Sequence, residues 1–225
     1  MTYSVKEIYY TLQGEGAQAG RAAVFLRFAG CNLWSGLEKD RQDAVCRFCD
    51  TDFVGTDGPG GGKFVDASSL ARAVFQQWPG RESAQSNILH APGKSYQGTP
   101  YVVCTGGEPL LQLDKGLVAA LHEEGFEIGI ETNGTLLPPS GIDWVCVSPK
   151  ADAEQKLKHG DELKLIYPQA DAPPERYAGQ DFRNFFLQPM DNADRGKNTE
   201  AATRYCLEHP QWRLSLQTHK LIGIR

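Results

Sequence analysis

The sequence predicts an α/β fold, a partial and open (β/α) barrel with fewer helices than a complete TIM barrel. Short segments rich in β-branched and aromatic residues alternate with segments of helical periodicity. This alternation favours parallel strands joined by right-handed crossovers. Helical periodicity is found in only three segments, too few for eight strand–helix units. The 225 residues show no second domain boundary, so we expect one domain spanning residues 1–225.

Eight segments are predicted as strands because each is short, apolar or aromatic, and bounded by Gly, Pro or Asn. In chain order they are residues 4–10, 22–30, 100–107, 126–134, 143–150, 162–168, 184–190 and 213–224. Helices are predicted at residues 66–78, 113–125 and 198–209. The second helix has Leu113, Leu117 and Leu121 on one stripe and ends at Gly125, a suitable C-cap.

Loop insertions are expected at about residues 54–64 and 79–99. The first contains GPGGGK, which lacks both the G-x4-G-K-[ST] spacing of a phosphate loop and a preceding strand. We interpret it as a flexible connection. The second shows little periodicity over some twenty residues.

Charge and composition narrow the class of protein. The net charge of -5 and the pI near 5.6 argue against a nucleic-acid-binding or anionic-membrane surface. No run of 18 apolar residues is present, and the amino terminus lacks the regions of a signal peptide. We therefore expect a cytoplasmic protein without membrane or nucleic-acid partners, in which thiols stay reduced.

Polar and glycine-rich clusters follow four of the predicted strands: TGGEP at 105–109, ETNG at 131–134, SPK at 148–150 and QPMD at 188–191. In parallel α/β architectures the loops after the carboxyl ends of the strands build the active site. Any one of these clusters could be an ordinary turn. The four clusters together predict one large ligand-binding cavity.

Three cysteines, Cys31, Cys46 and Cys49, form a C-x14-C-x2-C pattern. They could belong to a structural zinc site, although no histidine follows within 40 residues to complete it. They could be a pair beside an unrelated buried Cys31, or three ligands of a [4Fe–4S] cluster, which usually takes four. Spacing alone leaves zinc and iron–sulfur comparable. The other cysteines, at positions 104, 146 and 206, lie in apolar or helical segments and are interpreted as packing residues.

The neighbouring motifs carry a resemblance to a known family. They are LQGEG at 12–16, Arg27, GCNL at 30–33 and C-x2-C-D-T at 46–51, followed by the four clusters named above. Together they resemble the 7-carboxy-7-deazaguanine synthases of queuosine biosynthesis, which are radical S-adenosylmethionine (SAM) enzymes, and they span nearly the whole chain. The chain departs from the usual C-x3-C-x2-C spacing, so residues 33–45 are interpreted as an insertion that enlarges the cluster loop, of undetermined conformation.

The resemblance implies a partial barrel of the radical SAM type and a lyase that converts 6-carboxy-5,6,7,8-tetrahydropterin to 7-carboxy-7-deazaguanine with loss of ammonia. It implies a [4Fe–4S] cluster, SAM and Mg2+ as cofactors. A 5′-deoxyadenosyl radical would remove the C6 hydrogen before ring contraction, and SAM would be regenerated. A one-electron donor such as flavodoxin or ferredoxin and a homodimer are expected on the same ground. No catalytic side chain is assigned, because the cofactors carry the radical chemistry.

The resemblance also implies roles for particular residues. The three thiols Cys31, Cys46 and Cys49 would ligate the cluster, and Thr51 would contact Mg2+, although chemistry alone favours Asp50 and Asp52 as hard oxygen ligands. Cofactor binding is expected of Phe48, Cys49, Asp50, Gly107, Glu108, Ser148, Pro149, Lys150, Gln188, Pro189, Met190 and Asp191. Substrate binding is expected of Leu12, Gln13, Gly14, Glu15, Arg27, Thr105, His219 and Arg225.

Three of these assignments have a physical rationale. Gly106 and Gly107 would let the backbone approach the methionine part of SAM, and Glu108 would pair with its ammonium. In the strand at 22–30, Arg27 lies on the face opposite Leu26 and Phe28, so it would point into the barrel and grip a carboxylate. In the last predicted strand the side chains of Ser215, Gln217 and His219 would point to the same side, which makes His219 a candidate neighbour of the substrate.

Two alternatives stay open at this point. A glycyl-radical activating enzyme would share the cluster chemistry but act on a protein. A zinc-stabilised binding module would have no catalysis.

Overall fold

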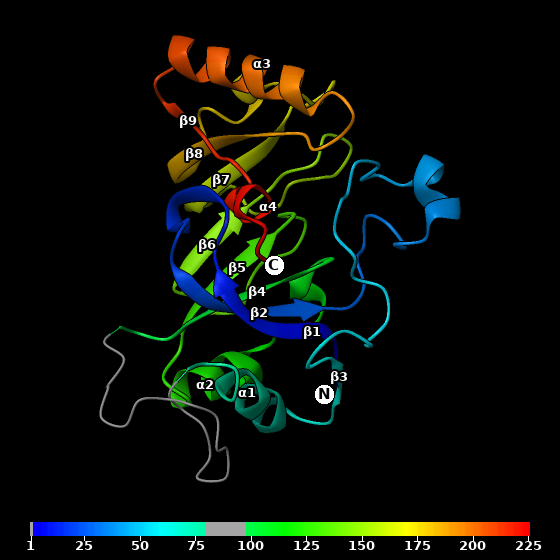
Figure 1. Cartoon of the computed structure of the whole chain (residues 1–225), viewed down its shortest axis with the longest axis vertical. Helices are drawn as coiled ribbons and strands as arrows, with labels where there is room; N and C mark the ends of the chain where they lie inside the picture. Colours follow the sequence, from blue (N-terminus) through cyan, green and yellow to red (C-terminus); the bar gives the residue numbers. More distant parts are fainter. Residues whose placement is uncertain (1, 80–97) are drawn as a thin grey trace.

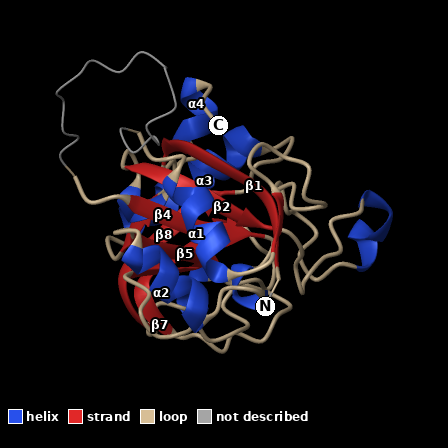
Figure 2. Ribbon diagram, turned by 90° about the horizontal axis from the view of Figure 1, so that it is seen from below, coloured by secondary structure: helices blue, strands red, loops and turns tan. Residues whose placement is uncertain are grey.

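The computed structural model describes residues 2–79 and 98–225 of the chain. Most of the predicted insertion at 79–99 therefore lies outside the described residues. The described strands form one mixed sheet in the order β3-β1-β2-β4-β5-β6-β7-β8-β9, which is curved but not closed (Figures 1 and 2). The strands are β1 (Tyr3–Leu12), β2 (Ala22–Phe28), β3 (Gly62–Phe64), β4 (Tyr101–Gly106), β5 (Glu127–Thr132), β6 (Trp144–Val147), β7 (His159–Tyr167), β8 (Asp181–Pro189) and β9 (Trp212–Leu214).

The predicted parallel arrangement is confirmed from β2 through β9. It is wrong for the edge formed by β1 and β3, because β1 pairs antiparallel with both β2 and β3. The loop from β1 to β2 is too short for a crossover connection, so only an antiparallel pair can form there. The predicted open α/β barrel is otherwise the observed architecture.

Three predicted helices are present, as α1 (Ala67–Phe75), α2 (Lys115–Glu123) and α3 (Arg195–Glu208). Asp66 and Asp114 cap the first two, each accepting a hydrogen bond from a backbone N–H of the first turn. α1 and α2 pack side by side on the face formed by β1, β2, β4 and β5, while α3 covers β8 and β9 at the other end (Figure 1). α1 and α2 thus bury apolar stripes against the sheet, whereas α3 contributes mainly Ala202, with partly buried Tyr205 and Cys206.

The face assignment within β2 is confirmed. Leu26 and Phe28 are fully buried in the core beneath α1 and α2. Arg27 points to the opposite side, where Phe25 stacks on Tyr9 of β1. Cys104 is buried in the core beneath α1 and α2, and Cys206 packs beside the second core, as expected of packing residues. Cys146 is also buried, but its thiol donates a hydrogen bond to Glu162 Oε1 at 3.5 Å, so its interpretation as an apolar packing residue is wrong.

The prediction of a flexible loop at 54–64 is wrong at its end, where Gly62–Phe64 form β3. The glycines serve close packing there, since a Cβ at Gly61 would lie 2.2 Å from the Lys6 carbonyl oxygen on β1. Backbone N–H groups of Gly58 and Ile8 also join this segment to β1. The glycine run is therefore a closely fitted edge of the sheet.

The last predicted strand, 213–224, is wrong beyond Leu214. The chain leaves the sheet at Ser215 and forms a short helix, α4 (Thr218–Ile222), that ends at Gly223 with a positive φ of 70°. Thr218 donates hydrogen bonds from its N–H and its hydroxyl to the Gly14 carbonyl oxygen. This anchor carries the C-terminal segment back to the middle of the sheet (Figure 1). The strand-like alternation of Ser215, Gln217 and His219 does not exist.

Four 3-10 turns complete the described chain: η1 (Gly16–Gln18), η2 (Glu38–Asp43), η3 (Pro109–Leu111) and η4 (Pro174–Arg176). η2 lies within the predicted insertion at 33–45 and stands away from the sheet at the right of Figure 1. Arg41 ties it back, because its guanidinium covers the Trp34 ring and donates to the carbonyl oxygens of Arg47 and Cys49.

Candidate active site

A cavity of about 540 Å³ opens where the carboxyl ends of β4, β5, β6 and β8 meet the cysteine loop and the C-terminal segment. Nearly all predicted site residues line it. They are Leu12, Gln13, Gly14, Glu15, Arg27, Cys31, Cys46, Phe48, Cys49, Asp50, Thr51, Thr105, Gly107, Ser148, Lys150, Gln188, Pro189, Met190, Asp191, His219 and Arg225. Residues from both ends of the chain are thus brought together at one mouth.

Glu108 and Pro149 do not line the cavity. Glu108 is fully buried beneath it and accepts hydrogen bonds from the Thr132 hydroxyl and from the backbone N–H groups of Asn133 and Leu110. Burial raises the pKa of its carboxyl group, although these donors oppose the rise. In this arrangement the carboxylate joins η3 to the end of β5, and its predicted contact with an ammonium group stays a prediction.

The glycines at 106 and 107 are required by contacts within the protein. A Cβ at Gly107 would lie 2.2 Å from the Gly30 carbonyl oxygen and 2.7 Å from the Cys31 Cβ. Gly106 has φ of 139° and would place a Cβ 2.3 Å from the Phe28 carbonyl oxygen. The two glycines therefore let β4 lie against the end of β2 and fix the first cysteine.

The three cysteines of the pattern face this cavity as free thiols. Cys31 and Cys49 pack against a small apolar cluster of Trp34, Ala44 and Phe53. The interaction between the neighbouring side chains of Cys46 and Cys49 lowers the pKa of Cys49 to about 6 and raises that of Cys46. A low thiol pKa favours the thiolate, the form that ligates metals.

The donor set, three thiols that face one cavity, fits an iron–sulfur cluster. Within residues 2–79 and 98–225, no group of three or more His, Cys, Asp and Glu side chains has the geometry to hold one metal ion. A cluster of four irons takes one thiolate on each ligated iron, so its ligands need not converge on one point. Three thiols on one wall of a cavity meet that need.

Thr51 also lines the cavity, beside the two carboxylates that chemistry alone favours as Mg2+ ligands. Asp50 is already paired with Lys220 at 2.6 Å, and Asp52 is paired with Lys6 at 3.0 Å. The structure thus engages both carboxylates in ion pairs and leaves the threonine facing the cavity.

One region of the cavity carries two arginines around a glutamate. Arg27 donates from Nε to Glu7 Oε1 at 2.8 Å and from a terminal nitrogen to the Tyr9 hydroxyl at 3.1 Å. Arg225 pairs with the other oxygen of Glu7 and lies over the Tyr9 ring. Two positive groups on one carboxylate leave a net positive charge, which suits an anionic ligand.

Glu7 and Tyr9 are functional neighbours that sequence reasoning missed. A break in register between Val5 and Glu7 shifts the alternation of β1, so that Val5 and Ile8 both pack in the core. A simple two-residue period cannot foresee this bulge. The only sequence signal was the placement of Glu7 two residues before Tyr9.

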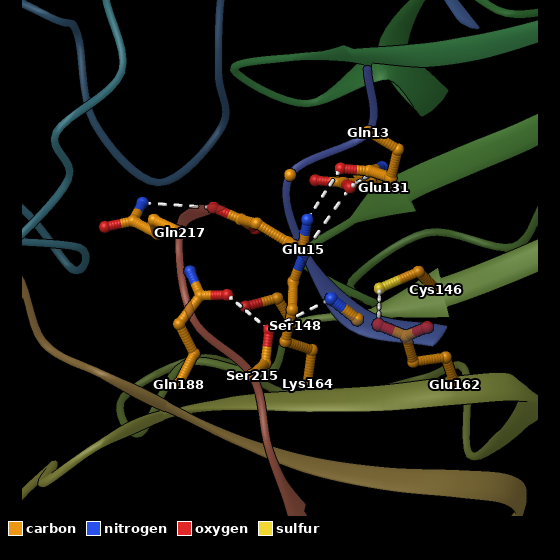
Figure 3. A network of polar contacts seen from close by, with 12 residues as sticks. Gln13, Glu15, Glu131, Cys146, Ser148, Glu162, Lys164, Gln188, Ser215 and Gln217 are labelled. Carbon is orange, nitrogen blue, oxygen red and sulfur yellow. Dashed lines mark hydrogen bonds and ion pairs between the residues drawn. The ribbon is translucent and has the colours of Figure 1, made fainter. Parts of the chain in front are cut away.

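A second region of the cavity joins the predicted Glu15 to Glu131 and Lys164, two residues that were missed, although Glu131 lies in the ETNG motif. The Lys164 ammonium lies 2.5 Å from Glu15 Oε2 and 3.4 Å from Glu131 Oε1, and Gln13 donates to Glu131 at 2.9 Å (Figure 3). Burial opposes ionisation of Glu15, but the charge and hydrogen bond of Lys164 lower its pKa below the usual value.

The C-terminal segment covers part of this mouth. His219 lies against Gly14, where a Cβ would stand 2.1 Å from its Nδ1, so glycine is required at position 14. Lys220 bridges Asp50 and Asp191 at 2.6 Å each, which joins the cysteine loop, the loop after β8 and α4.

Comparisons with known proteins place these features in context. No protein-family model matches the chain. It is 60% identical over 224 residues to the 7-carboxy-7-deazaguanine synthase of Caulobacter vibrioides and 62% identical over 224 residues to that of Bordetella pertussis, with 100% of each chain covered in both cases. The solved structure of QueE from Escherichia coli superposes with a TM-score of 0.67 at 25% identity, covering 96% of this chain and 94% of that chain. Within the described residues, no helix has the length and apolar character to cross a membrane.

Proposed function

Because the chain belongs to the 7-carboxy-7-deazaguanine synthase family of radical SAM enzymes, we propose that it converts 6-carboxy-5,6,7,8-tetrahydropterin to 7-carboxy-7-deazaguanine with loss of ammonia. The observation that carries this proposal is one cavity lined both by the three free thiols and by the Arg27 region. When bound, a [4Fe–4S] cluster and SAM supply one-electron reduction and radical removal of the C6 hydrogen.

Two charged regions of the cavity suit opposite parts of this substrate. The C6 carboxylate is the anion for Arg27, whose planar fork can hold both oxygens. Glu7 keeps the guanidinium oriented while the second arginine, Arg225, adds charge. The 2-amino-4-oxo ring is rich in N–H donors, which suits the carboxylates of Glu15 and Glu131.

The remaining cavity residues would hold SAM. Lys150 already donates hydrogen bonds to the Ser148 carbonyl oxygen and hydroxyl at 2.6 and 2.8 Å, so the SPK turn is preorganised. Asp191, held by Lys220, and Gln188, which accepts a hydrogen bond from Ser215, supply further polar groups of the cavity. Thr51 would share Mg2+ with the substrate and water, since Mg2+ keeps several waters and needs few protein ligands.

Three further expectations remain, of which the electron donor and the homodimer rest on family membership and the compartment on the sequence composition. A flavodoxin or ferredoxin would deliver the electron, the enzyme would act as a homodimer, and it would work in the cytoplasm. Pull-down with each candidate donor and measurement of the molar mass in solution check the first two.

Anaerobic reconstitution with iron and sulfide tests the proposal. The protein should turn brown, and after reduction it should form 7-carboxy-7-deazaguanine from SAM and the carboxytetrahydropterin. A colourless protein that binds one zinc ion per chain would establish the binding-module alternative instead. Turnover of SAM that needs a protein acceptor, with no deazaguanine product, would establish the activating-enzyme alternative.

A further inference from the structure

Lys164 is a buried cation within the cavity. Its side chain is 4% exposed and extends from β7, which is separated from β2 and Arg27 by three strands in the sheet order. A buried ammonium is costly unless it is paired and hydrogen-bonded. Lys164 meets this condition only through Glu15 at 2.5 Å and Glu131 at 3.4 Å, the partners recorded among the described residues. Its position thus depends on two carboxylates that face the same cavity.

The two carboxylates are fixed from several directions (Figure 3). Glu15 Oε1 accepts from the Gln217 side chain at 3.0 Å, and Glu131 Oε1 accepts from Gln13 at 2.9 Å. Gln13 is held in turn, because its side-chain oxygen accepts from the Glu15 backbone N–H at 3.1 Å. In the part of the chain that the structure describes, no group donates to Glu131 Oε2. One oxygen of the pair is therefore left for a ligand.

We propose that Lys164 is a positioning residue that holds Glu15 and Glu131 as adjacent anionic acceptors for the donor edge of a 2-amino-4-oxo heterocycle. This rests on the proposed function, which supplies a substrate of that class. Such an edge presents the ring N3–H and the 2-amino N–H side by side. An ionised carboxylate can only accept hydrogen bonds, so it matches both donors.

The charge of Lys164 keeps both carboxylates ionised, so that both accept hydrogen bonds. Two carboxylates in a buried site repel each other, and without a cation one of them takes up a proton. A protonated carboxyl group donates a hydrogen bond and then opposes the N–H edge. Lysine thereby selects a ring with a 2-amino group over one with a 2-oxo group, whose oxygen would face an anion.

Other titratable groups surround the pair and enter any pH dependence. Glu162 and Cys146 face Lys164 from β7 and β6, Tyr101 faces Glu131 from β4, and His219 faces Glu15 from α4. Burial raises the pKa of Glu162, Cys146 and Tyr101, which disfavours a charge on each of them near neutral pH.

Equilibrium binding of two unreactive ligands tests the proposal: 6-carboxypterin, and 6-carboxylumazine, in which the 2-amino group is replaced by oxygen. The reconstituted wild type should prefer the pterin. K164M should weaken pterin binding by about tenfold, as expected for losing a charge-assisted contact, and bring the two dissociation constants together. In K164M alone, pterin binding should tighten as the pH rises from 6 to 8, because the protonated carboxyl group ionises again.

K6M is the matched control. Lys6 is also a buried lysine of the cavity paired with two carboxylates, Asp52 and Asp57, in the loop after the cysteines. The K6M variant should leave the preference between the two ligands unchanged. If K164M melts below the assay temperature, K164Q, whose amide still donates to one carboxylate, should show the same loss of preference.

The outcomes separate the two proposals. A wild type that binds neither ligand overturns the proposed function and this inference with it. A wild type that prefers the pterin, with a folded K164M or K164Q that keeps that preference and shows no new pH dependence, overturns the role of Lys164 alone.

Discussion

Replacing Gly107 by alanine should displace the first cysteine and weaken iron binding. The added Cβ would lie 2.2 Å from the Gly30 carbonyl oxygen, which is 1.2 Å short of the 3.4 Å at which ordinary contact begins. It would also lie 2.7 Å from the Cys31 Cβ. A shift of ~1 Å exceeds the ~0.5 Å tolerance of a ligand set. Iron and sulfide content after reconstitution should therefore fall well below that of the wild type.

The same clash has a cost in stability. Overpacking of this kind costs about 1–3 kcal/mol. The Gly30 oxygen also accepts a 3.0 Å hydrogen bond from the Glu108 N–H, and its loss adds roughly 1 kcal/mol. For a chain of this length each kcal/mol lowers Tm by about 2–4 °C, so the apoprotein should melt some 4–16 °C lower.

G196A is the control, because a Cβ at Gly196 in α3 has no atom within 4 Å. Alanine is the better helix former, so G196A should keep its iron and gain up to about 1 kcal/mol. Anaerobic iron and sulfide assays and calorimetry of the apoproteins measure both effects. A G107A protein with wild-type iron content and wild-type Tm would refute the packing argument.

Four other substitutions give three separate tests. C46A should abolish activity and lower the iron content, while C206A, which changes a packing residue of α3, should keep most of both. Equal losses in the two variants would mean that the division into ligand and packing cysteines is wrong. Burial raises the pKa of Glu162 above 4.5, so the folded protein holds this proton more tightly than the unfolded chain does. The stability that this proton contributes is fully present below about pH 4.5 and is lost as the pH rises through the raised pKa. E162Q should remove that loss, and its stability relative to wild type, measured by denaturant titration, should increase with pH; a difference that stays constant with pH contradicts this reasoning. K220M breaks two ion pairs that are partly exposed, so it should lower the free energy of unfolding by only about 1 kcal/mol. It should nevertheless speed amide hydrogen exchange in residues 215–225. Unchanged exchange there would show that Lys220 does not hold α4 in place.

The place of the candidate site was predicted from local signals, and the roles of its residues from the resemblance to a family. Cys31, Cys46 and Cys49 are recognisable by residue type and spacing, and the TGGEP, ETNG, SPK and QPMD clusters by their place after apolar segments. Parallel strands then bring these ends together without further information. This explains why most of the predicted residues line one cavity.

Other parts of the site depend on contacts between distant segments. Glu7 faces the cavity because of a bulge, which the residue pattern of β1 does not reveal. Gly14 and Gly107 are required by His219 and Cys31, each far away in the sequence. The reason for each glycine could be found only from its neighbours in space.

The sequence by itself predicted the α/β class, the order of most helices and strands, and the three cysteines that share one cavity, because periodicity and residue spacing are local properties. Only the tertiary structure decided the antiparallel edge, the path of residues 215–225 over the cavity, and the pairing of Glu15 with Lys164 across 149 positions. In the sequence, Glu15 lies in the LQGEG motif and Lys164 in a predicted strand, and nothing links the two. Because both side chains lie in one cavity away from water, each charge needs the other as its partner.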